Sequence, residues 1–359
     1  MLCRGGDTVE TVMVTIQEVA QASGASKTAV SLVLNNKDAK RVNPQVAERI
    51  RRAAEELGYR PNSIARSLRT KRTRTLGFIS DEIASTPFAG KLILGAQDAA
   101  RDLGYVLLTI NTNNDAQIED EGIAALRRYG VDGFLYAFMY HRVVRVPQSL
   151  LALPTVVLDA EDVDGVIPGI MPDEPHLSYA ATERLVSAGR RRILYVGTTA
   201  PIPAREQRLS GYRQAMEDSP IGFDAELVVD ISDDVDAFDV ADEAIRRLRP
   251  DGIVCFNDIR ATVVYDCMKT QGLVVGEDTD VIGIDNQPFI AQMLRPRLTS
   301  VELPHYEMGY WSVAKLVSII EDRDPADLVL PEQLGEMPSL TQSHALAYGK
   351  VIDKQSVRM

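Results

Sequence analysis

Near the start of the chain, apolar residues recur at the spacing of two short helices joined by a tight turn. Thr15 suits the N-cap of the first helix, and Glu18 completes a capping box. Gly24 ends that helix because glycine readily adopts the left-handed backbone of a sharp turn, and Ser26 caps the next helix. The two apolar faces are Ile16, Val19 and Ala20, and Val30, Val33 and Leu34. The pattern predicts a helix-turn-helix, with an ordinary αα-hairpin as the alternative.

A third helix follows. Asn43 suits its N-cap, Pro44 its first position and Gly58 its end. Its apolar stripe consists of Val46, Ile50, Ala53, Ala54 and Leu57. Three helices of this size make a small headpiece, in which the second helix keeps one outward face. That face consists of Lys27, Thr28, Ser31 and Leu32. A helix with such a face can enter the DNA major groove.

The next segment reads as a short basic helix. Pro61 interrupts the chain, Asn62 can cap a helix, and the helical pattern ends near Arg69. A helix this short is not stable alone in water, so we expect it to order when a partner binds. It runs into a basic stretch of Lys71, Arg72 and Arg74.

From Leu76 onward, short apolar runs alternate with amphipathic segments. The runs are bounded by Gly, Asp or Asn and suit strands of a parallel sheet that is buried on both faces. They are TLGFIS, YVLLTIN, GFLYAF, TVVLDA, RILYVGT, ELVVDI, GIVCFND and DVIGIDN. The predicted helices span 88–103, 117–129, 176–189, 204–217, 237–249 and 259–272. This alternation predicts an α/β fold with doubly wound parallel sheets.

An internal echo indicates two α/β halves. Residues 128–134 (RYGVDGF) resemble residues 247–253 (RLRPDGI), and each segment lies at a predicted helix-to-strand junction. Two similar halves imply two lobes with a cleft between them, and about 280 residues are enough for both. Ligands of open α/β sheets bind beyond the carboxyl ends of the strands, so the cleft is the expected binding site.

Polar residues stand at several predicted strand ends. Asp159 follows TVVL, Asn257 follows GIVCF and Asp285 follows VIGI. Arg208 lies early in the helix after RILYVGT. Carboxylates and an amide beside a guanidinium can hold neighbouring hydroxyl groups, which favours a polyhydroxylated ligand. The alternatives are a structural ion pair for Arg208 and, for strand-end acids such as Asp258, capping of the next helix, which we expect of Asp258.

Charge divides the chain at the same place as the hydrophobic pattern. Residues 1–75 hold 14 Lys and Arg against 7 Asp and Glu, whereas residues 76–359 hold 25 against 44. A basic head on an acidic body is typical of a nucleic-acid-binding module joined to another domain. A solvated basic linker would explain the charge but not the helix-turn-helix spacing beside it.

The segments VTIQEVAQASGASKTAVSLVLNN and VNPQVAERIRRAAEELGYRPNSIARSLRTKRTRTLGFI resemble the head and hinge of the lactose-repressor (LacI/GalR) family of bacterial transcription regulators. The resemblance continues more loosely to about residue 340. It implies an all-α helix-turn-helix headpiece followed by a two-lobed α/β domain similar to periplasmic sugar-binding proteins. The expected divisions are an N-terminal extension (1–13), the headpiece (14–60), hinge helix and linker (61–74), an effector-binding and dimerisation domain (75–340) and a C-terminal tail (341–359).

The resemblance also implies which residues contact DNA. The major-groove readers are Lys27, Thr28 and Leu32, with Ser31 nearby. The residues used mainly on phosphates are Thr15, Ser26, Asn35, Tyr59 and Asn62. Leu68, with Ala65 and Arg69 beside it, matches the leucine that wedges into the minor groove when two hinge helices order together. Most relatives carry Arg or His at position 32; Leu32 cannot donate a hydrogen bond, so we expect an altered base preference there.

For the effector, the resemblance implies contacts from Phe88, Asp159, Arg208, Asn257 and Asp285. It favours a sugar, sugar phosphate or polyol. A nucleoside or purine is less favoured, because Ala160 stands where some relatives carry a pocket aromatic ring. The one Trp of the chain, Trp311, lies on a late helix.

Several other features of the sequence narrow the class of protein. The sequence has too few cysteines for a disulfide framework, namely Cys3, Cys255 and Cys267. Its four His residues do not have the spacing of metal ligands. The first residues have no apolar core typical of a secretion signal, and no segment has the length of a membrane span, so we expect a cytoplasmic protein; Met13 is a possible initiator. No catalytic constellation or cofactor motif is visible. The residues after Ser339 are polar without periodicity, so we expect little regular structure there.

The sequence therefore predicts a homodimeric regulator, in our interpretation a repressor, that binds a pseudo-palindromic operator and is controlled by a small molecule. Whether the effector releases or promotes DNA binding stays open, as does dimer against tetramer. The alternative is a ligand-binding protein of the periplasmic type, or an enzyme, that carries a basic head.

Overall fold

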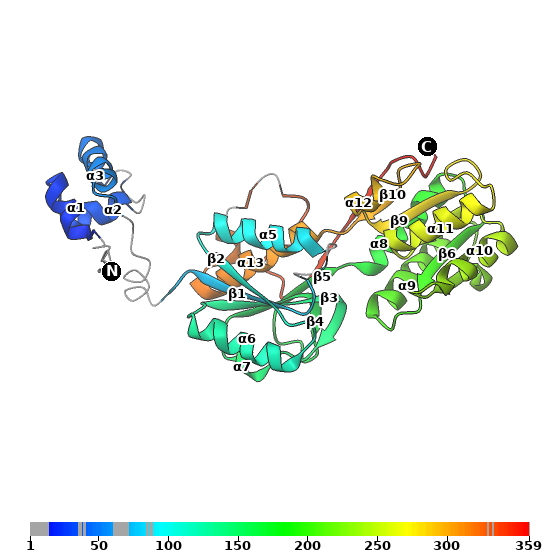
Figure 1. Cartoon of the computed structure of the whole chain (residues 1–359), viewed down its shortest axis with the longest axis horizontal. Coiled ribbons are helices and arrows are strands. Elements are labelled where there is room, and N and C mark those ends of the chain that lie inside the picture. The colour runs from blue at the N-terminus through cyan, green and yellow to red at the C-terminus, as the bar shows by residue number, and fades with distance from the viewer. Residues whose placement is uncertain are drawn as a thin grey trace, which may run out of the picture. The chain divides into compact units, whose positions relative to one another are not determined.

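The computed structural model describes residues 14–34, 38, 41–59, 72–83, 86, 89–328, 330–331 and 334–358. The chain separates into two compact units, Met1–Thr73 and Arg74–Met359. We call the described part of the first unit the headpiece and the second unit the body, and we describe each by itself (Figure 1).

The headpiece is a bundle of three helices around a small apolar core. The capping box is present: the Thr15 backbone N–H donates to a Glu18 carboxylate oxygen at 2.6 Å, and the Glu18 backbone N–H donates to Thr15 Oγ1 at 3.3 Å. Gly24 has the left-handed φ of 64° that the turn requires. Asn43 caps the third helix by accepting from the backbone N–H of Gln45. The helices are α1 (Ile16–Ser23), α2 (Lys27–Leu34) and α3 (Pro44–Glu56).

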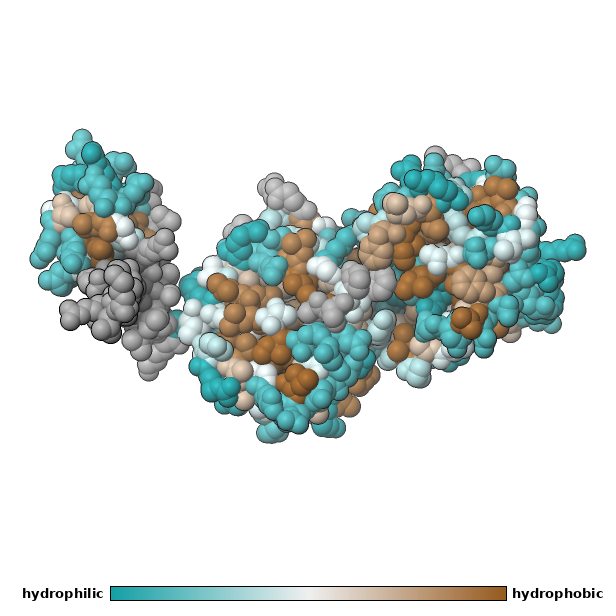
Figure 2. Space-filling view, viewed as in Figure 1, coloured by the Kyte–Doolittle hydropathy of each residue, from teal (hydrophilic) through white to brown (hydrophobic). Residues whose placement is uncertain are grey.

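Two details of the headpiece core differ from the prediction. Leu57 is 39% exposed, because α3 ends at Glu56 and Leu57 lies in its C-cap. Ala47 is buried, whereas Val46 is only partly buried. Elsewhere the predicted apolar faces meet in one cluster, and Figure 2 shows hydrophilic residues over much of the visible headpiece surface. The core consists of Val19, Ala20, Val30, Val33, Ala47, Ile50, Ala53 and Ala54.

The body contains two six-stranded sheets, which confirms the predicted two-lobed α/β fold. The first sheet has the strand order β11-β5-β4-β3-β1-β2 and is parallel throughout. The second has the order β12-β10-β9-β8-β6-β7, in which only β12 is antiparallel. The first-sheet strands are β1 (Thr75–Ser80), β2 (Val106–Asn111), β3 (Gly133–Val144), β4 (Thr155–Asp162), β5 (Gly169–Pro172) and β11 (His344–Ala347). The second-sheet strands are β6 (Ile193–Thr198), β7 (Val228–Ile231), β8 (Gly252–Cys255), β9 (Asp280–Asp285), β10 (Thr299–Glu302) and β12 (Lys350–Ile352).

Helices cover both faces of each sheet. In the first lobe α5 and α13 pack together on one face, and α6 and α7 lie on the other. In the second lobe α8 and α9 pack on one face, and α10 and α11 on the other. The first-lobe helices are α5 (Gly90–Asp102), α6 (Ala116–Arg128), α7 (Gln148–Leu151) and α13 (His305–Glu321). The second-lobe helices are α8 (Glu174–Ser187), α9 (Pro203–Asp218), α10 (Asp236–Leu248), α11 (Asp258–Thr270) and α12 (Pro288–Ala291), with short 3₁₀ turns at Ala225–Leu227 and Pro325–Asp327.

The internal repeat of the sequence makes the same kind of backbone contact in both lobes. The Asp132 carboxylate accepts from the backbone N–H of Arg74, just before β1. In the second lobe the Asp251 carboxylate accepts from the backbone N–H groups of Arg191 and Arg192, just before β6. Each aspartate thus ties the start of its own strand to the start of the neighbouring strand. The repeated Asp-Gly pair is therefore a shared building element of the two lobes.

The residues after Ser339 contradict the expectation of little regular structure. His344–Ala347 forms β11, which pairs with β5 in the first sheet, and Lys350–Ile352 forms β12, which pairs with β10 in the second. Ala345 and Ala347 are fully buried. Backbone pairing and a few small buried side chains stabilise these strands, so a hydrophobic pattern of useful length is absent from the sequence. Strand β2 is likewise not buried on both faces, because it is the edge of its sheet.

One close helix contact in the second lobe positions the site described next. A Cβ at Gly211 on α9 would lie 2.0 Å from the backbone oxygen of Pro175 on α8. Only glycine allows the two helices to approach this closely. The approach brings Arg208, one turn earlier on α9, against Glu174 at the start of α8.

Candidate functional site

The headpiece exposes part of the predicted DNA-reading face. Lys27 and Thr28 at the start of α2 are exposed, whereas Ser31 and Leu32 are half-buried. The face is therefore narrower than the sequence indicated. Lys27 Nζ donates to the side-chain oxygen of Gln17 at 2.9 Å, a contact between α1 and α2 that the sequence reasoning missed. This bond orients the lysine across the turn.

The predicted phosphate-contacting residues of the headpiece have local structural roles as well. Thr15 makes the capping box of α1, and the Ser26 side chain accepts from the backbone N–H of Ala29 at the start of α2. Tyr59 is half-buried against the headpiece core. Five predicted DNA-contacting residues lie outside the described residues: Asn35, Asn62, Ala65, Leu68 and Arg69.

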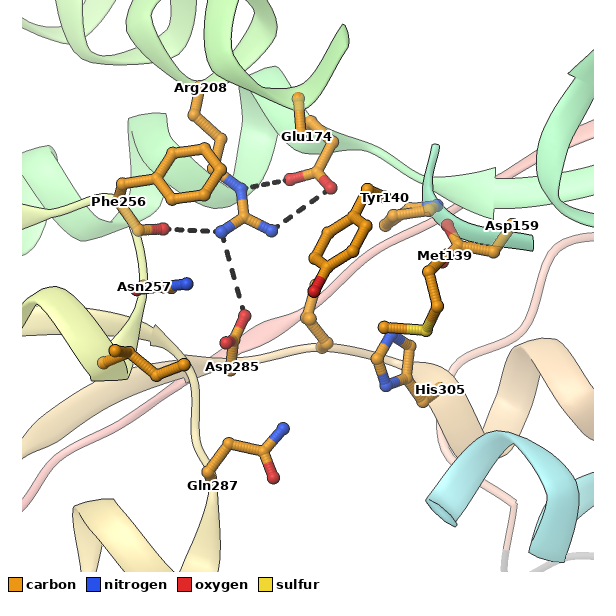
Figure 3. A pocket seen from close by; sticks show the side chains of 14 residues that line it. Met139, Tyr140, Asp159, Glu174, Arg208, Phe256, Asn257, Asp285, Gln287 and His305 are labelled. Carbon is orange, nitrogen blue, oxygen red and sulfur yellow. Dashed lines mark hydrogen bonds and ion pairs between the residues drawn. The ribbon is translucent and has the colours of Figure 1, made fainter. Parts of the chain in front are cut away.

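In the body, four of the predicted effector residues line one cavity, which we call the pocket. Asp159 lies inside β4, three residues before its end, and not at the strand end that the sequence predicted. Asn257 follows β8, Asp285 ends β9 and Arg208 lies on α9 (Figure 3). The pocket thus lies at the carboxyl ends of strands from both sheets, as open α/β folds require. Phe88 lies outside the described residues.

The free volume of the pocket is about 70 Å³. Sites that hold small organic ligands have roughly 300–1,000 Å³. The pocket as it stands is therefore too small for a sugar, and a ligand of that size requires side chains or lobes to move apart.

Arg208 is buried and fully engaged. Its Nε and Nη2 donate to the two carboxylate oxygens of Glu174 at 2.5 and 3.2 Å, and its Nη1 donates to the Phe256 backbone oxygen at 2.5 Å. Asp285 Oδ1 lies 3.7 Å from the same Nη1. Burial by itself lowers the pKa of the guanidinium, but Glu174 and Asp285 outweigh burial and raise it. Arg208 is thus held charged in a structural ion pair, the alternative raised by the sequence.

The other two carboxylates of the pocket are less well compensated. Burial is the main cause that raises the pKa of Asp159 well above its ordinary value, and Glu174 and Asp81 add to it. Burial also raises the pKa of Asp285 well above its ordinary value, although Arg208 opposes the shift. The pocket therefore carries an excess of acidic groups over basic ones.

The strand end at Asn257 and Asp258 differs from the prediction. Asn257, not Asp258, is the N-cap of α11, since its side-chain oxygen accepts from the backbone N–H of Arg260 at 3.0 Å. Figure 3 shows its amide nitrogen on the pocket side. Asp258 is fully buried and accepts from the Gln287 backbone N–H and the Ser300 hydroxyl, and burial raises its pKa to about 6. Asp258 therefore joins the start of α11 to the start of α12 and to β10.

Ala160 does not leave the pocket without an aromatic ring. Tyr140 and Phe256 both line it, and Figure 3 shows the Tyr140 ring between Arg208 and Asp159. Trp311 is buried in the first-lobe core instead. Tyr140 reaches the pocket from an irregular point in β3, where the register with β4 shifts between Ala137 and Arg142. Position 160 alone was a poor guide, because the ring comes from a different strand.

Positive backbone φ angles gather at the pocket. Tyr140 has φ 67°, Asp159 φ 54° and Asp285 φ 114°. Such angles are costly for residues other than glycine and persist where the surrounding structure enforces them, most often at functional sites. The strain supports a binding role for this end of the sheets.

Sequence reasoning missed several lining residues. Glu174 precedes the helix predicted over 176–189, and in the structure it lies in the first turn of α8, where an acidic residue favours the helix dipole in any case. Only the contact between α8 and α9 gives it another role. The remaining missed lining residues are Met139, Pro172, Ala204, Ile259, Gln287, Leu303 and His305.

The described part of the chain shows no sign of a metal site, a membrane span or a reactive thiol. Those residues contain no group of three or more His, Cys, Asp and Glu side chains placed to hold a metal ion. None of their helices has the length and apolar character needed to cross a membrane. Cys255 and Cys267 are buried and unpaired, and burial raises the pKa of the Cys267 thiol to about 11. Neither thiol has the lowered pKa of a nucleophilic cysteine.

Comparison with known proteins covers both units. A family described as bacterial regulatory proteins, lacI family, matches residues 15–62, and one described as periplasmic binding proteins and sugar binding domain of the LacI family matches residues 73–336. The HTH-type transcriptional regulator RegA of Clostridium saccharobutylicum is 31% identical over 336 residues, which is 90% of this chain and 98% of that protein.

Two solved structures extend the comparison. A putative LacI-family transcriptional regulator from Rhizobium etli is 25% identical with a TM-score of 0.68, over 80% of this chain and 100% of that one. The lac repressor dimer bound to operator and the anti-inducer ONPF is 19% identical with a TM-score of 0.67, over 96% of this chain and 99% of that one, a likeness of fold. The chain therefore belongs to the LacI family of bacterial regulatory proteins, DNA-binding transcriptional regulators that join a helix-turn-helix to a periplasmic-binding-protein-like domain.

Proposed function

We propose that this chain is an operator-binding repressor whose affinity for DNA is set by a small molecule in the pocket. The observation that carries the proposal is the combination, in one chain, of a capped helix-turn-helix with exposed Lys27 and Thr28 and a pocket of strained polar residues at the strand ends. A ligand-binding protein that does not bind DNA does not need the helix-turn-helix. A repressor that no small molecule controls does not need the pocket.

In this proposal the headpiece of residues 14–60 reads DNA. Lys27 and Thr28 contact base edges, Ser31 and Leu32 border them, and Thr15, Ser26, Asn35, Tyr59 and Asn62 contact phosphates. Two chains form a homodimer, so that two headpieces meet the half-sites of a pseudo-palindromic operator. The lac repressor named above is a dimer bound to operator, which supports this arrangement.

The hinge and linker of residues 61–74 couple the two units in the proposal. Leu68, with Ala65 and Arg69, enters the minor groove when two hinges meet. Leu68→Ala is expected to weaken specific binding far more than non-specific binding, since a wedge contact contributes only at the operator. Leu32→Arg is expected to change the preferred base at one position of each half-site, which a binding-site selection reads directly.

Asp159, Asn257 and Asp285 hold the effector in the proposal, and Arg208, which the sequence also predicted as a contact, is held in the pocket by Glu174. A coupling free energy of about 1–3 kcal/mol between pocket and headpiece is enough for a useful switch. The pocket binds its ligand and does not convert it, and supporting this, the one guanidinium among its described lining residues is committed to Glu174.

The test is a gel shift of the full-length chain with fragments of its own genome, at low salt, with and without sugars and polyols. The proposal expects one or a few fragments to be retained in preference to the rest, with affinity that falls steeply as salt rises. An effector that raises the Kd is an inducer, and one that lowers it is a co-repressor. Equal retention of all fragments, or of none, contradicts the proposal.

A further inference from the structure

The described lining of the pocket holds more carboxyl groups than guanidinium groups. Three carboxylates, those of Asp159, Glu174 and Asp285, line it beside one guanidinium among the described lining residues, that of Arg208. Asp81 is buried next to it and adds to the negative field at Asp159. Buried charges are stable only when they are paired, so an uncompensated excess requires an explanation.

Arg208 does not balance this excess, because its charge is already used. Glu174 accepts from both its Nε and its Nη2, and the Phe256 backbone oxygen accepts from Nη1. Asp285 adds a weaker ion pair at 3.7 Å. The pair with Glu174 is electrically neutral, which leaves the carboxyl groups of Asp159 and Asp285 without a full counter-charge. A phosphate or carboxylate entering here would meet carboxylates and an occupied guanidinium.

Asp159 is the group without a partner. It is 5% exposed, lines the pocket, and makes no hydrogen bond or ion pair with any residue that the structure describes. Its backbone is held in the left-handed region at φ 54°, so the structure keeps the side chain in this position at some cost. A buried carboxylate fixed towards a cavity lacks the donor that would compensate its burial.

The Tyr140 ring adds a second feature that suits a cation. It lines the same pocket as Asp159, and Tyr140 has a positive φ as well (Figure 3). The face of an aromatic ring attracts a cation, and the attraction adds to that of a nearby carboxylate. A ring and a carboxylate together make a site for an ammonium group.

From this geometry we infer that the effector carries a protonated amine, which pairs with Asp159 and lies against the Tyr140 ring, while its hydroxyl groups contact Asn257 and Asp285. The inference rests on the proposed effector role of the pocket and narrows its ligand to hydroxylated amines, of which amino sugars are the simplest. It excludes sugar phosphates.

The test uses matched ligands that differ in one group. Isothermal titration of the full-length chain at neutral pH compares the 2-amino-2-deoxy and 6-amino-6-deoxy derivatives of glucose and galactose with the parent sugars and the 6-phosphates. At least one amino derivative is expected to bind about tenfold or more tightly than its parent, with the phosphates weakest. The inference is overturned if a parent or a phosphate binds more tightly than its amino derivatives, or if no amino derivative binds below about 10 mM.

The variant Asp159→Asn assigns the effect to one group. Asn tolerates positive φ better than most residues, so the fold is expected to survive. Affinity for the amino derivative is expected to fall about tenfold or more, while that for the parent sugar changes by less than about threefold. Glu161→Gln removes an exposed charge from the same strand and is expected to change neither. Equal loss of both ligands in Asp159→Asn, or of neither, contradicts the inference.

A second variant still tests the inference if Asp159→Asn does not fold. Tyr140→Leu removes the ring from a side chain that is 44% exposed and is expected to lower affinity for the amino derivative about threefold or more, with little change for the parent. An unchanged preference for the amine contradicts the inference. These titrations contain no DNA, so they stand apart from the gel shift: operator binding can fail while amine selectivity holds, and the reverse.

Discussion

The headpiece and the pocket hold their polar side chains in opposite ways. Headpiece residues such as Thr15 and Lys27 are exposed, and their partners lie within ten residues along the chain. Pocket residues are buried, and Arg208 meets its partner Glu174 across 34 residues and two helices. The headpiece is thus a surface built by local rules, whereas the pocket is a charge cluster built by the packing of whole elements.

The difference predicts different consequences of mutation. A change on the headpiece surface alters what the surface touches and leaves the fold nearly intact. A change in the pocket disturbs buried charges and alters the stability of the body. Substitutions in each region therefore test whether the headpiece and the pocket are built in these different ways.

The largest effect is expected for Glu174→Ala. It leaves the Arg208 guanidinium buried without its main partner, and such a loss typically costs about 3–5 kcal/mol. Urea unfolding, followed by the fluorescence of Trp311 in the core of the body, measures the change in the free energy of unfolding. Glu183→Ala, an exposed residue on the same helix, is the matched control. A loss below about 1 kcal/mol would mean that the pocket is not organised around this ion pair.

Lys27→Ala is expected to act on DNA alone. The variant loses a base-edge contact, for which about 1–3 kcal/mol is typical, and operator affinity falls about tenfold to a hundredfold. Stability changes little because the bond to Gln17 is exposed. Fluorescence anisotropy with the selected operator gives the affinity, and Lys269→Ala, exposed on the body, is the control. Operator affinity in Lys27→Ala equal to that in Lys269→Ala would show that Lys27 does not contact a base.

Thr15→Ala tests the local construction of the headpiece. It removes the side chain that accepts from the Glu18 backbone N–H, and loss of an N-cap costs about 1 kcal/mol. Hydrogen exchange of the α1 amides is expected to quicken about fivefold, while the amides of the body keep their protection. Glu48→Ala, exposed on α3, serves as the comparison. Faster exchange in the body as well would remove the distinction between local and long-range construction.

Asp159→Asn is expected to stabilise the ligand-free body, by an amount on the order of 1 kcal/mol. The folded-state pKa of Asp159 is raised above its unfolded value, so the ionised form destabilises the fold above that pKa, and the penalty fades as pH falls through it. The melting temperature should therefore rise more at pH 8 than at pH 5. Glu161→Gln is the control, and a destabilised variant at pH 8 would show that Asp159 has a partner there.

Local construction also explains how far the sequence could predict this molecule. The start and end of α1 are predicted by three residues within ten positions, Thr15, Glu18 and Gly24. The structure confirms the capping box and the left-handed glycine. The six helices predicted in the body begin and end within about two residues of those found. Patterns of this kind are local, so one sequence is enough to find them.

The pocket was predictable only in part. Asn257 and Asp285 stand at strand ends, a local signal, and the parallel topology brings them to one pocket with Asp159, which lies inside β4. Glu174 and Tyr140 give no such signal, because one depends on the contact between α8 and α9 and the other on a register shift within β3. The strands β11 and β12 were missed for the same reason, since their pairing partners lie far away in the sequence.

The central claim is that one chain couples a local DNA-reading surface to a buried charge cluster. Anisotropy of the wild-type chain and of Asp285→Asn with the selected operator, before and after addition of the small-molecule fraction of a cell extract, tests it directly. The wild type is expected to change its operator Kd about fivefold or more, and Asp285→Asn to bind the operator without responding. A wild-type chain that prefers no sequence, or a variant that responds as the wild type does, contradicts the account.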